Sequence, residues 1–158
     1  MRVTVSNSTV SKSKVLLVED SKFLRMANER ALSRAGYDVS TAADGEEALR
    51  IANDKLPDII LLDMMLPRIS GPDVLRALKA NPATLDIPVI VLTSLSQQNE
   101  GKLLSEGATA YFEKSSLGLD QSSDRLAATM ETVLNRVNHK KRLDLRLKEL
   151  AIKKSGGG

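Results

Sequence analysis

The chain contains no cysteine, which excludes a disulfide scaffold, a thiolate metal site and a cysteine nucleophile. Histidine is almost as scarce, because His139 is the only one. A catalytic triad or a multi-histidine zinc site would therefore have to be built around that single residue. The lack of cysteine also fits a reducing compartment.

Aromatic residues make up only 3% of the chain, and tryptophan is absent. The core must then be built from aliphatic side chains, and binding by aromatic stacking is disfavoured. Long apolar runs are missing as well. The longest, residues 15–18 and 59–62, are far shorter than the roughly 20 residues that span a bilayer. Residues 1–14 lack the apolar stretch of a signal peptide, so we expect a cytoplasmic protein with no membrane partner.

What the chain does have is the composition of one soluble globular domain, with 158 residues, 42% of them hydrophobic and 27% charged. The formal net charge of +3 is unevenly distributed. Residues 1–135 contain 15 Lys/Arg and 18 Asp/Glu, whereas residues 136–158 contain 8 and 2. The excess positive charge therefore lies in the C-terminal tail and says nothing about the folded body.

Short apolar runs alternate with amphipathic stretches between Lys14 and Val137, a pattern typical of a parallel sheet covered by helices on both faces. We expect strands at residues 15–18, 37–42, 59–62, 89–92 and 110–112. We expect helices between Ser21 and Gly36 and at residues 46–53, 72–81, 97–105 and 122–137. In the first of these helices, Phe23, Ala27 and Ala31 recur at four-residue spacing and predict its apolar stripe. The fold class is thus α/β, with a doubly wound sheet of five strands and five helices.

Polar residues stand at the carboxyl ends of four of these strands, where ligands bind in open parallel sheets. They are Glu19, Asp20, Asp63, Thr93 and Lys114. Right-handed crossovers bring these strand ends to the same edge of the sheet. Three clustered carboxylates repel one another and favour a hard divalent cation such as Mg²⁺. A hydroxyl and an ammonium group beside them suit a tetrahedral anion, so the pattern predicts an aspartyl phosphate site.

These residues resemble those of the receiver domain of two-component response regulators, of the chemotaxis-regulator type, over residues 13–137. The matching features are the acidic pair Glu19-Asp20, Asp63 within LLDMMLP, Gly71 after that loop, Thr93 followed by Ser94, Tyr111 and Lys114. The spacings are 43 residues from Asp20 to Asp63, 30 to Thr93 and 21 to Lys114. The resemblance implies a flavodoxin-like strand order 2-1-3-4-5 and a signalling protein that is not an enzyme.

The resemblance also assigns roles to single residues. It implies that Asp63 accepts a phosphoryl group from a sensor histidine kinase or phosphotransfer protein, with Thr93 and Lys114 binding the phosphoryl oxygens. Mg²⁺ would be held by Glu19 or Asp20, by Asp63 and by the backbone carbonyl of Met65. Tyr111 would turn into the space that Thr93 vacates, or else be an ordinary half-buried strand residue.

One departure from the family concerns the residue after Lys114, which is Ser115 where the family usually has a cis proline. A non-proline cis bond costs roughly 2.5 to 4 kcal/mol. Either the surrounding loop enforces the cis bond, or the Lys114 carbonyl is oriented differently. A second feature concerns persistence of the signal. The residues two positions after Asp63 and Thr93 flank the path of hydrolytic water in the family, and the apolar Met65 and Leu95 found there predict slow loss of the phosphoryl group.

Two alternatives to a complete receiver protein remain. The chain can be a receiver fragment of a larger regulator whose output module is absent. A phosphatase of the haloacid dehalogenase type also uses an aspartate nucleophile with Mg²⁺, but it needs a second acid at the position of Met65. A nucleotide-binding domain is disfavoured because no GxGxxG or GxxxxGK[ST] motif follows any expected strand.

Residues 138–158 form a basic tail that is helical or flexible. Its helix formers place Leu143, Leu147 and Leu150 on one stripe. The tail is a solvated helix, a helix that binds an unidentified protein or a second copy of the chain, or a linker. A nucleic-acid role has support from the charge but no recognition fold, and His139 is expected to be a surface residue.

Overall fold

Five parallel strands form one sheet in the order β2-β1-β3-β4-β5 in a computed structural model that describes residues 12–93, 104–113 and 121–156. The elements along the chain are β1 (Lys14–Val18), α2 (Lys22–Arg34), β2 (Asp38–Ala42), α3 (Gly45–Lys55), β3 (Ile59–Asp63), α4 (Gly71–Ala80), β4 (Val89–Thr93), β5 (Ala110–Glu113) and α6 (Gln121–Gly156). The predicted sheet and strand order are confirmed. Four helices have described bounds, and the helix expected at residues 97–105 falls almost wholly outside the described residues.

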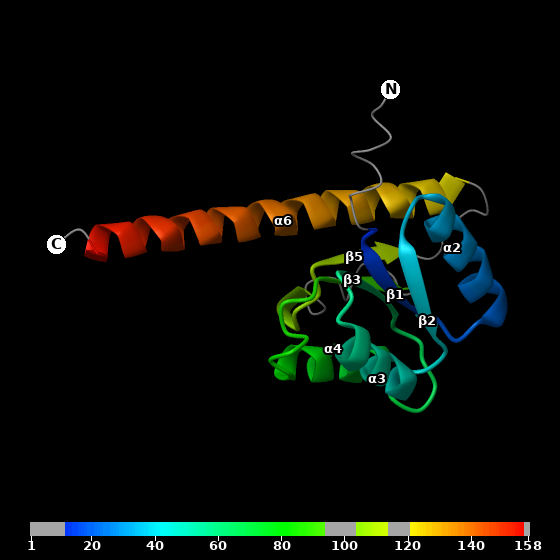
Figure 1. Ribbon diagram of the computed structural model, residues 1–158. Helices are drawn as coiled ribbons and strands as arrows, with labels where there is room; N and C mark the ends of the chain where they lie inside the picture. Colours follow the sequence, from blue (N-terminus) through cyan, green and yellow to red (C-terminus); the bar gives the residue numbers. More distant parts are fainter. Residues whose placement is uncertain (1–11, 94–103, 114–120, 157–158) are drawn as a thin grey trace, which may run out of the picture.

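The helices lie in two layers, with α3 and α4 on one face of the sheet and α2 and α6 on the other (Figure 1). Alternate residues of the central strands supply the two cores. In β1, Leu16 and Val18 pack toward α3 and α4, whereas Val15 and Leu17 pack toward α2 and α6. A strand buried on both faces must be apolar at every position, which explains its continuous apolar run.

A side-chain cap begins each helix that follows one of the first three strands. Ser21, Asp44 and Ser70 are the N-cap residues of α2, α3 and α4, and each accepts a hydrogen bond from the backbone N–H three residues later. Such caps satisfy N–H groups that have no partner within the helix. The chain is therefore turned into a helix soon after it leaves β1, β2 and β3, at the edge where the polar residues were predicted to meet.

The buried face of α2 differs from the predicted stripe. Phe23 is 68% exposed, and the buried residues of this helix are Asn28 and Leu32. The predicted residues (Phe23, Ala27 and Ala31) and the buried residues are offset by one position but share the same four-residue spacing. Spacing alone therefore cannot show which of the two faces is buried. The prediction that Phe23 lies on the packed stripe is therefore wrong.

Helix α6 is longer than the predicted helix and runs far past the body (Figure 1). Its first half closes the core with Leu126, Met130, Val133 and Leu134, and Val137 is partly buried against them. Every residue from 138 to 154 is exposed. The tail is thus a direct helical continuation of α6. None of the helices in the described part of the chain combines the length and apolar character needed to cross a lipid bilayer.

Candidate functional site

Three carboxylates meet at the carboxyl ends of β1 and β3. Glu19, Asp20 and Asp63 each offer one oxygen, and these oxygens lie within 4.8 Å of one another. Glu19 and Asp63 are buried, whereas Asp20 is exposed. The adjacent pairing of β1 and β3 brings these residues together across a gap of more than 40 positions in the sequence. The structure therefore brings the three predicted carboxylates together in one cluster.

Hydrogen bonds hold the acidic turn between β1 and α2. The Ser21 N–H donates to Glu19 Oε2 at 3.2 Å. Arg25, one turn into α2, donates from one guanidinium nitrogen to the backbone carbonyls of Glu19 at 2.9 Å and Asp20 at 3.4 Å. A guanidinium has several donors in a rigid plane and can engage two acceptors at once. Arg25 thus fixes the main chain from which both acidic side chains project.

The loop after β3 is equally constrained. The backbone N–H of Met65 donates to Asp63 Oδ1 at 3.0 Å, which orients one carboxylate oxygen. Gly71 packs directly beneath this loop and donates its N–H to the Met64 carbonyl at 3.3 Å. A Cβ at position 71 would lie 2.5 Å from Met64 Cα and 2.6 Å from the Asp63 carbonyl oxygen. Only glycine allows this approach without displacing the backbone beside Asp63.

The remaining predicted residues are distributed along the next strands. Thr93 is buried at the last position of β4, where its register partner in β5 is Glu113. Tyr111 is half-buried on β5, opposite Val91, and packs against the core beneath α3 and α4. Lys114 follows the last residue of β5 and lies outside the described residues.

Two further predictions concern residues outside the described part of the chain. One is the conformation of the peptide bond between Lys114 and Ser115, and the other is the place of Leu95 beside the path of the hydrolytic water. These predictions therefore stay predictions. Met65, the partner of Leu95 in the hydrolysis argument, is described and leaves 59% of its surface exposed beside Asp63.

The donor set fits a magnesium ion. Two oxygens bound to one Mg²⁺ at about 2.1 Å lie at most about 4.2 Å apart. Oxygens that are already within 4.8 Å of one another need only small movements to share such an ion. An all-oxygen, all-carboxylate set also matches the preference of this hard cation.

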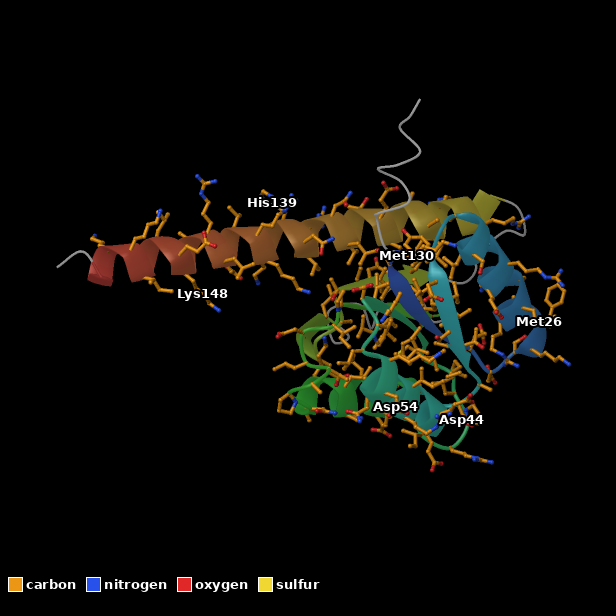
Figure 2. The ribbon with its side chains drawn as sticks, in the orientation of Figure 1. Met26, Asp44, Asp54, Met130, His139 and Lys148 are labelled. Carbon is orange, nitrogen blue, oxygen red and sulfur yellow. The ribbon has the colours of Figure 1, made fainter. Side chains whose placement is uncertain are left out.

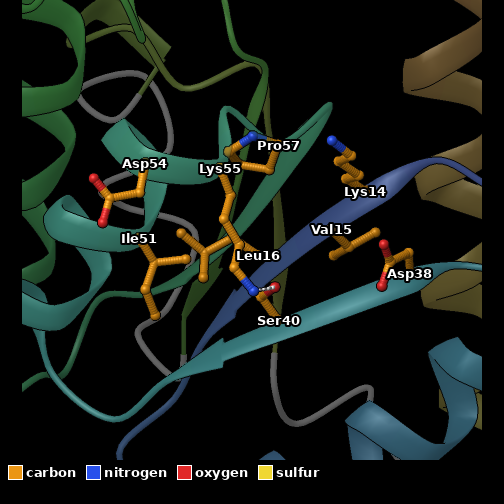
Figure 3. Close-up of a pocket in the computed structure, with 9 residues that line it drawn as sticks. All are labelled: Lys14, Val15, Leu16, Asp38, Ser40, Ile51, Asp54, Lys55 and Pro57. Carbon is orange, nitrogen blue, oxygen red and sulfur yellow. Dashed lines mark hydrogen bonds between the residues drawn. The ribbon is translucent and has the colours of Figure 1, made fainter.

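A separate hollow of about 390 Å³ lies at the other edge of the sheet, around the start of β1 and β2 (Figure 3). Its charged lining residues come from strand starts and from the end of α3, and they are Lys14, Asp38, Asp54 and Lys55. The Lys55 ammonium donates to Ser40 Oγ at 3.1 Å. Because ligands of open parallel sheets bind at the carboxyl edge, this hollow stands apart from the acidic site.

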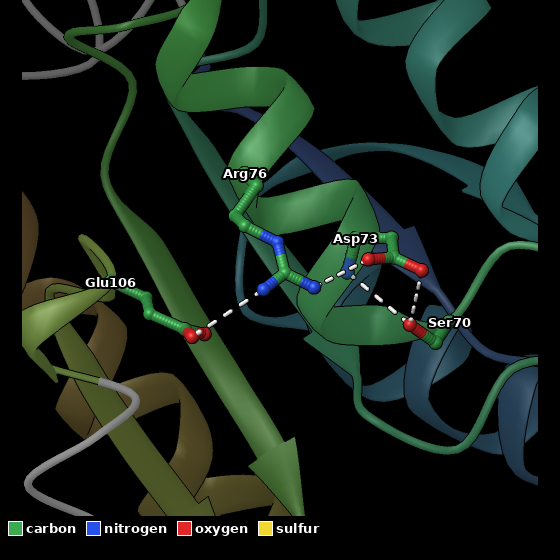
Figure 4. Close-up of polar contacts among 4 residues, drawn as sticks. All are labelled: Ser70, Asp73, Arg76 and Glu106. Carbon is green, nitrogen blue, oxygen red and sulfur yellow. Dashed lines mark hydrogen bonds and ion pairs between the residues drawn. The ribbon is translucent and has the colours of Figure 1, made fainter.

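A polar chain links the start of α4 to the turn before β5 (Figure 4). Asp73 accepts from the guanidinium of Arg76 and from Ser70 Oγ, the latter at 2.9 Å. The hydrogen bond from Arg76, with a smaller contribution from Ser70, lowers the pKa of Asp73 below its ordinary value. Arg76 also lies 3.6 Å from the carboxylate of Glu106. These contacts tie the helix that follows the Asp63 loop to the segment that enters β5.

Comparison with known proteins agrees with this geometry. The family model of the response regulator receiver domain matches residues 15–121. The chain is 43% identical over 118 residues to the gliding motility regulatory protein of Myxococcus xanthus, an alignment covering 72% of this chain and 15% of that protein. It is 39% identical over 102 residues to the alkaline phosphatase synthesis transcriptional regulatory protein PhoP of Bacillus subtilis, covering 64% and 42%.

A solved structure aligns over its whole length. The chemotaxis response regulator CheY4 of Vibrio cholerae matches with a TM-score of 0.70 and 31% identity, covering 78% of this chain and 99% of that chain. The chain therefore belongs to the receiver-domain family of two-component response regulators, as the residues predicted. Receiver domains are signalling domains that interact with histidine kinases or phosphotransfer proteins and bind Mg²⁺ at an acidic pocket. The chain spans less than half the length of the two curated relatives above.

The phosphatase alternative is not better supported than the receiver domain, because the matching family model and the relatives above are those of response regulators. The structure adds one residue to the site that sequence reasoning missed, namely Arg25. A basic residue in the first turn of a surface helix is common, so nothing in the sequence pattern distinguishes it. Its contact with the Glu19 and Asp20 carbonyls becomes evident only when the turn between β1 and α2 is folded.

Proposed function

We propose that Asp63 is the phosphoacceptor of this receiver domain. A carboxylate oxygen of Asp63 attacks the phosphorus of a phosphohistidine on a sensor kinase or phosphotransfer protein. A P–O bond forms as the P–N bond breaks, and the histidine nitrogen keeps the electron pair and takes up a proton. The Met65 N–H, bound to Asp63 Oδ1, restricts the rotation of the attacking carboxylate.

The residues around Asp63 have distinct roles in this proposal. Glu19 or Asp20, Asp63 and the Met65 carbonyl would hold Mg²⁺, which neutralises charge on the transferring group. Thr93 and Lys114 would bind the phosphoryl oxygens. Inward movement of Thr93, with Tyr111 turning into the space vacated, would change the surface offered to a downstream protein.

The observation that carries the proposal is the burial of Asp63 within 4.8 Å of two other carboxylates at the end of a central strand. Burying like charges together is unfavourable unless a cation offsets the repulsion. Thr93 ends the neighbouring strand β4, whose Leu92 is the register partner of Asp63. A hydroxyl donor therefore stands beside the acidic cluster at the same edge of the sheet.

The test uses Mg²⁺ and acetyl phosphate as a small phosphodonor, with intact mass spectrometry and peptide mapping. We expect one phosphoryl group on Asp63 and none on Asp63→Asn. The matched control is Asp58→Asn, an exposed aspartate before the same strand, which should be phosphorylated like the wild type. Stoichiometric modification of Asp63→Asn would refute the assignment. Unchanged Mg²⁺ affinity in Glu19→Ala/Asp20→Ala would remove both acids from the metal site.

The proposal extends to how the protein acts. It signals through phosphorylation-dependent contacts with a protein target rather than by turning over a small substrate. The receiver body ends near Val137, where burial along α6 ceases. A cytoplasmic location is supported by the absence of cysteine, which suits a reducing compartment. Relatives that are longer than this chain, of which the alignments cover 15% and 42%, support the alternative that such a receiver operates within a larger regulator.

A further inference from the structure

The exposed half of α6 carries an apolar seam. Leu143, Leu147 and Leu150 leave 48%, 64% and 54% of their surface exposed. Figure 2 shows the side chains of this half, His139 and Lys148 among them, extending into open space beyond the body. The spacing of four and then three residues is that of the narrow seam of a two-stranded coiled coil.

This seam is not a continuation of the face that packs on the sheet. At 100° per residue, the direction of Leu143, Leu147 and Leu150 is rotated by roughly 100° from that of Leu126, Met130, Val133 and Val137. The receiver body therefore lies to the side of the seam and does not block it. A second helix can approach the seam along its whole length.

We propose that the seam pairs with the same seam of a second copy of this chain, in a parallel two-stranded coiled coil. In parallel and in-register pairing, leucine lies opposite leucine in three consecutive layers. Antiparallel pairing offsets the layers and places at least one seam leucine opposite Lys140 or Lys154. The parallel arrangement therefore buries more apolar surface at a smaller desolvation cost.

The charges beside the seam permit self-pairing but weaken it, because residues 136–158 contain 8 Lys/Arg and only 2 Asp/Glu. Three basic residues of the tail, Lys141, Arg142 and Lys148, project away from the seam, whereas Arg146 and Lys153 flank it. The pairs that would face one another across the parallel interface are His139 with Asp144 and Arg146 with Ala151, neither of which joins like charges. Lys140 and Lys154 lie at the two ends of the seam, where each faces its own copy in the parallel pair. A lysine at such a position sets register and dimeric state, while the repulsion between like charges weakens the pair.

The expected dimer is weak, because three leucine layers correspond to only about one and a half heptads. A sustained coiled-coil pattern has at least three or four heptads. Its formation does not depend on phosphorylation of Asp63, so unphosphorylated full-length chain is the sample. Sedimentation equilibrium from about 10 µM to 1 mM should show a mass rising from 17.2 kDa toward twice that value. A mass that stays at 17.2 kDa across this range would overturn the proposal.

The chain supplies a matched pair of leucine variants. Leu147→Glu should abolish the rise in mass, whereas Leu145→Glu, altering a leucine of similar exposure outside the seam, should leave it intact. Both positions are exposed, so circular dichroism should show folded protein for each. Truncation after Val137 should also give a monomer that still accepts phosphate on Asp63. If Leu147→Glu and Leu145→Glu reduced the rise in mass equally, general hydrophobicity of the helix, and not the seam, would drive association.

The lack of native cysteine allows a test of direction. Lys154→Cys should form an interchain disulfide under mild oxidation, because the parallel arrangement places the two copies of position 154 opposite each other. Lys148→Cys, on the outward side of the helix, should form none at the same concentration. Equal cross-linking of both variants, or cross-linking of the second alone, would overturn the parallel pairing. Association that appears only with anionic vesicles or nucleic acid would overturn the proposal as a whole.

Discussion

The guanidinium of Arg25 donates a hydrogen bond of 2.9 Å to the backbone carbonyl of Glu19. The same nitrogen reaches the carbonyl of Asp20 at 3.4 Å. Arg25 therefore positions the main chain of the acidic turn without itself being a metal ligand. Its positive charge, by contrast, acts against the binding of a cation nearby. Geometry and charge thus have opposite effects on magnesium affinity, and substitutions can separate them.

We predict that Arg25→Lys, which keeps the charge but loses the planar double donor, weakens Mg²⁺ binding about threefold to tenfold, or about 0.7–1.4 kcal/mol. Isothermal titration at constant ionic strength measures this change. Arg30→Lys, altering an exposed residue of the same helix, should bind Mg²⁺ like the wild type. Tighter binding in Arg25→Ala than in the wild type would mean that charge repulsion outweighs positioning.

The second prediction concerns Gly71. The added methyl group of Gly71→Ala would meet Met64 Cα and the Asp63 carbonyl at 2.5 and 2.6 Å, so the backbone of the loop must move. We expect a loss of about 1–3 kcal/mol in the free energy of unfolding by urea and a reduced yield of phosphorylated Asp63. Ala80→Ser, at the exposed end of the same helix, is the control. Wild-type stability and phosphorylation in Gly71→Ala would show that the loop has room for a Cβ.

The third prediction concerns pH. The hydrogen bond from Arg76 lowers the pKa of Asp73 below 3.8 in the folded protein, so ionised Asp73 stabilises the fold. This stabilisation is fully present above about pH 4 and is lost as the pH falls through the lowered pKa. Asp73→Asn should therefore reduce the urea midpoint at pH 7, and its difference from wild type should shrink as the pH falls below 3.8 and through the lowered pKa of Asp73. Arg76→Gln should behave similarly. A difference in urea midpoint between variant and wild type that does not change with pH would contradict the link between the ionisation of Asp73 and stability.

The fourth prediction concerns the lifetime of the phosphoryl group. Met65 is exposed beside Asp63, and a thioether cannot orient an attacking water as an amide or carboxylate can. Met65→Asn/Leu95→Glu should therefore lose phosphate about tenfold faster than the wild type in Mg²⁺ buffer. Met26→Asn, altering an exposed methionine of α2, should decay at the wild-type rate. Equal decay of wild type and the double variant would remove both positions from control of hydrolysis.

The sheet could be predicted from the sequence because strands buried on both faces require unbroken apolar runs, as in β1, β3 and β4. Convergence of Glu19, Asp20 and Asp63 followed from the parallel topology. The packed face of α2 could not be predicted, since the inward position of Asn28 breaks the apolar pattern. The position of Lys114 stays a prediction because it lies outside the described residues.

The length of α6 was left open by the sequence for a different reason. No glycine or proline occurs between Gln121 and Ser155, so no residue marks an end to the helix. At the same time, no apolar stripe in line with Leu126 and Met130 continues past Val137 to hold the helix on the body. The local preference of the tail residues for helix then decides the outcome, and the helix continues into solvent.

Because α6 is a single helix, it also works as a lever arm. Leu126, Met130 and Val133 clamp one end against the sheet, and about 28 Å of helix projects beyond Val137. A tilt of about 5° at the clamped end would displace the far end by about 2.5 Å, given that length. Small repacking in the core beneath α6 would thus be amplified at a point remote from the sheet.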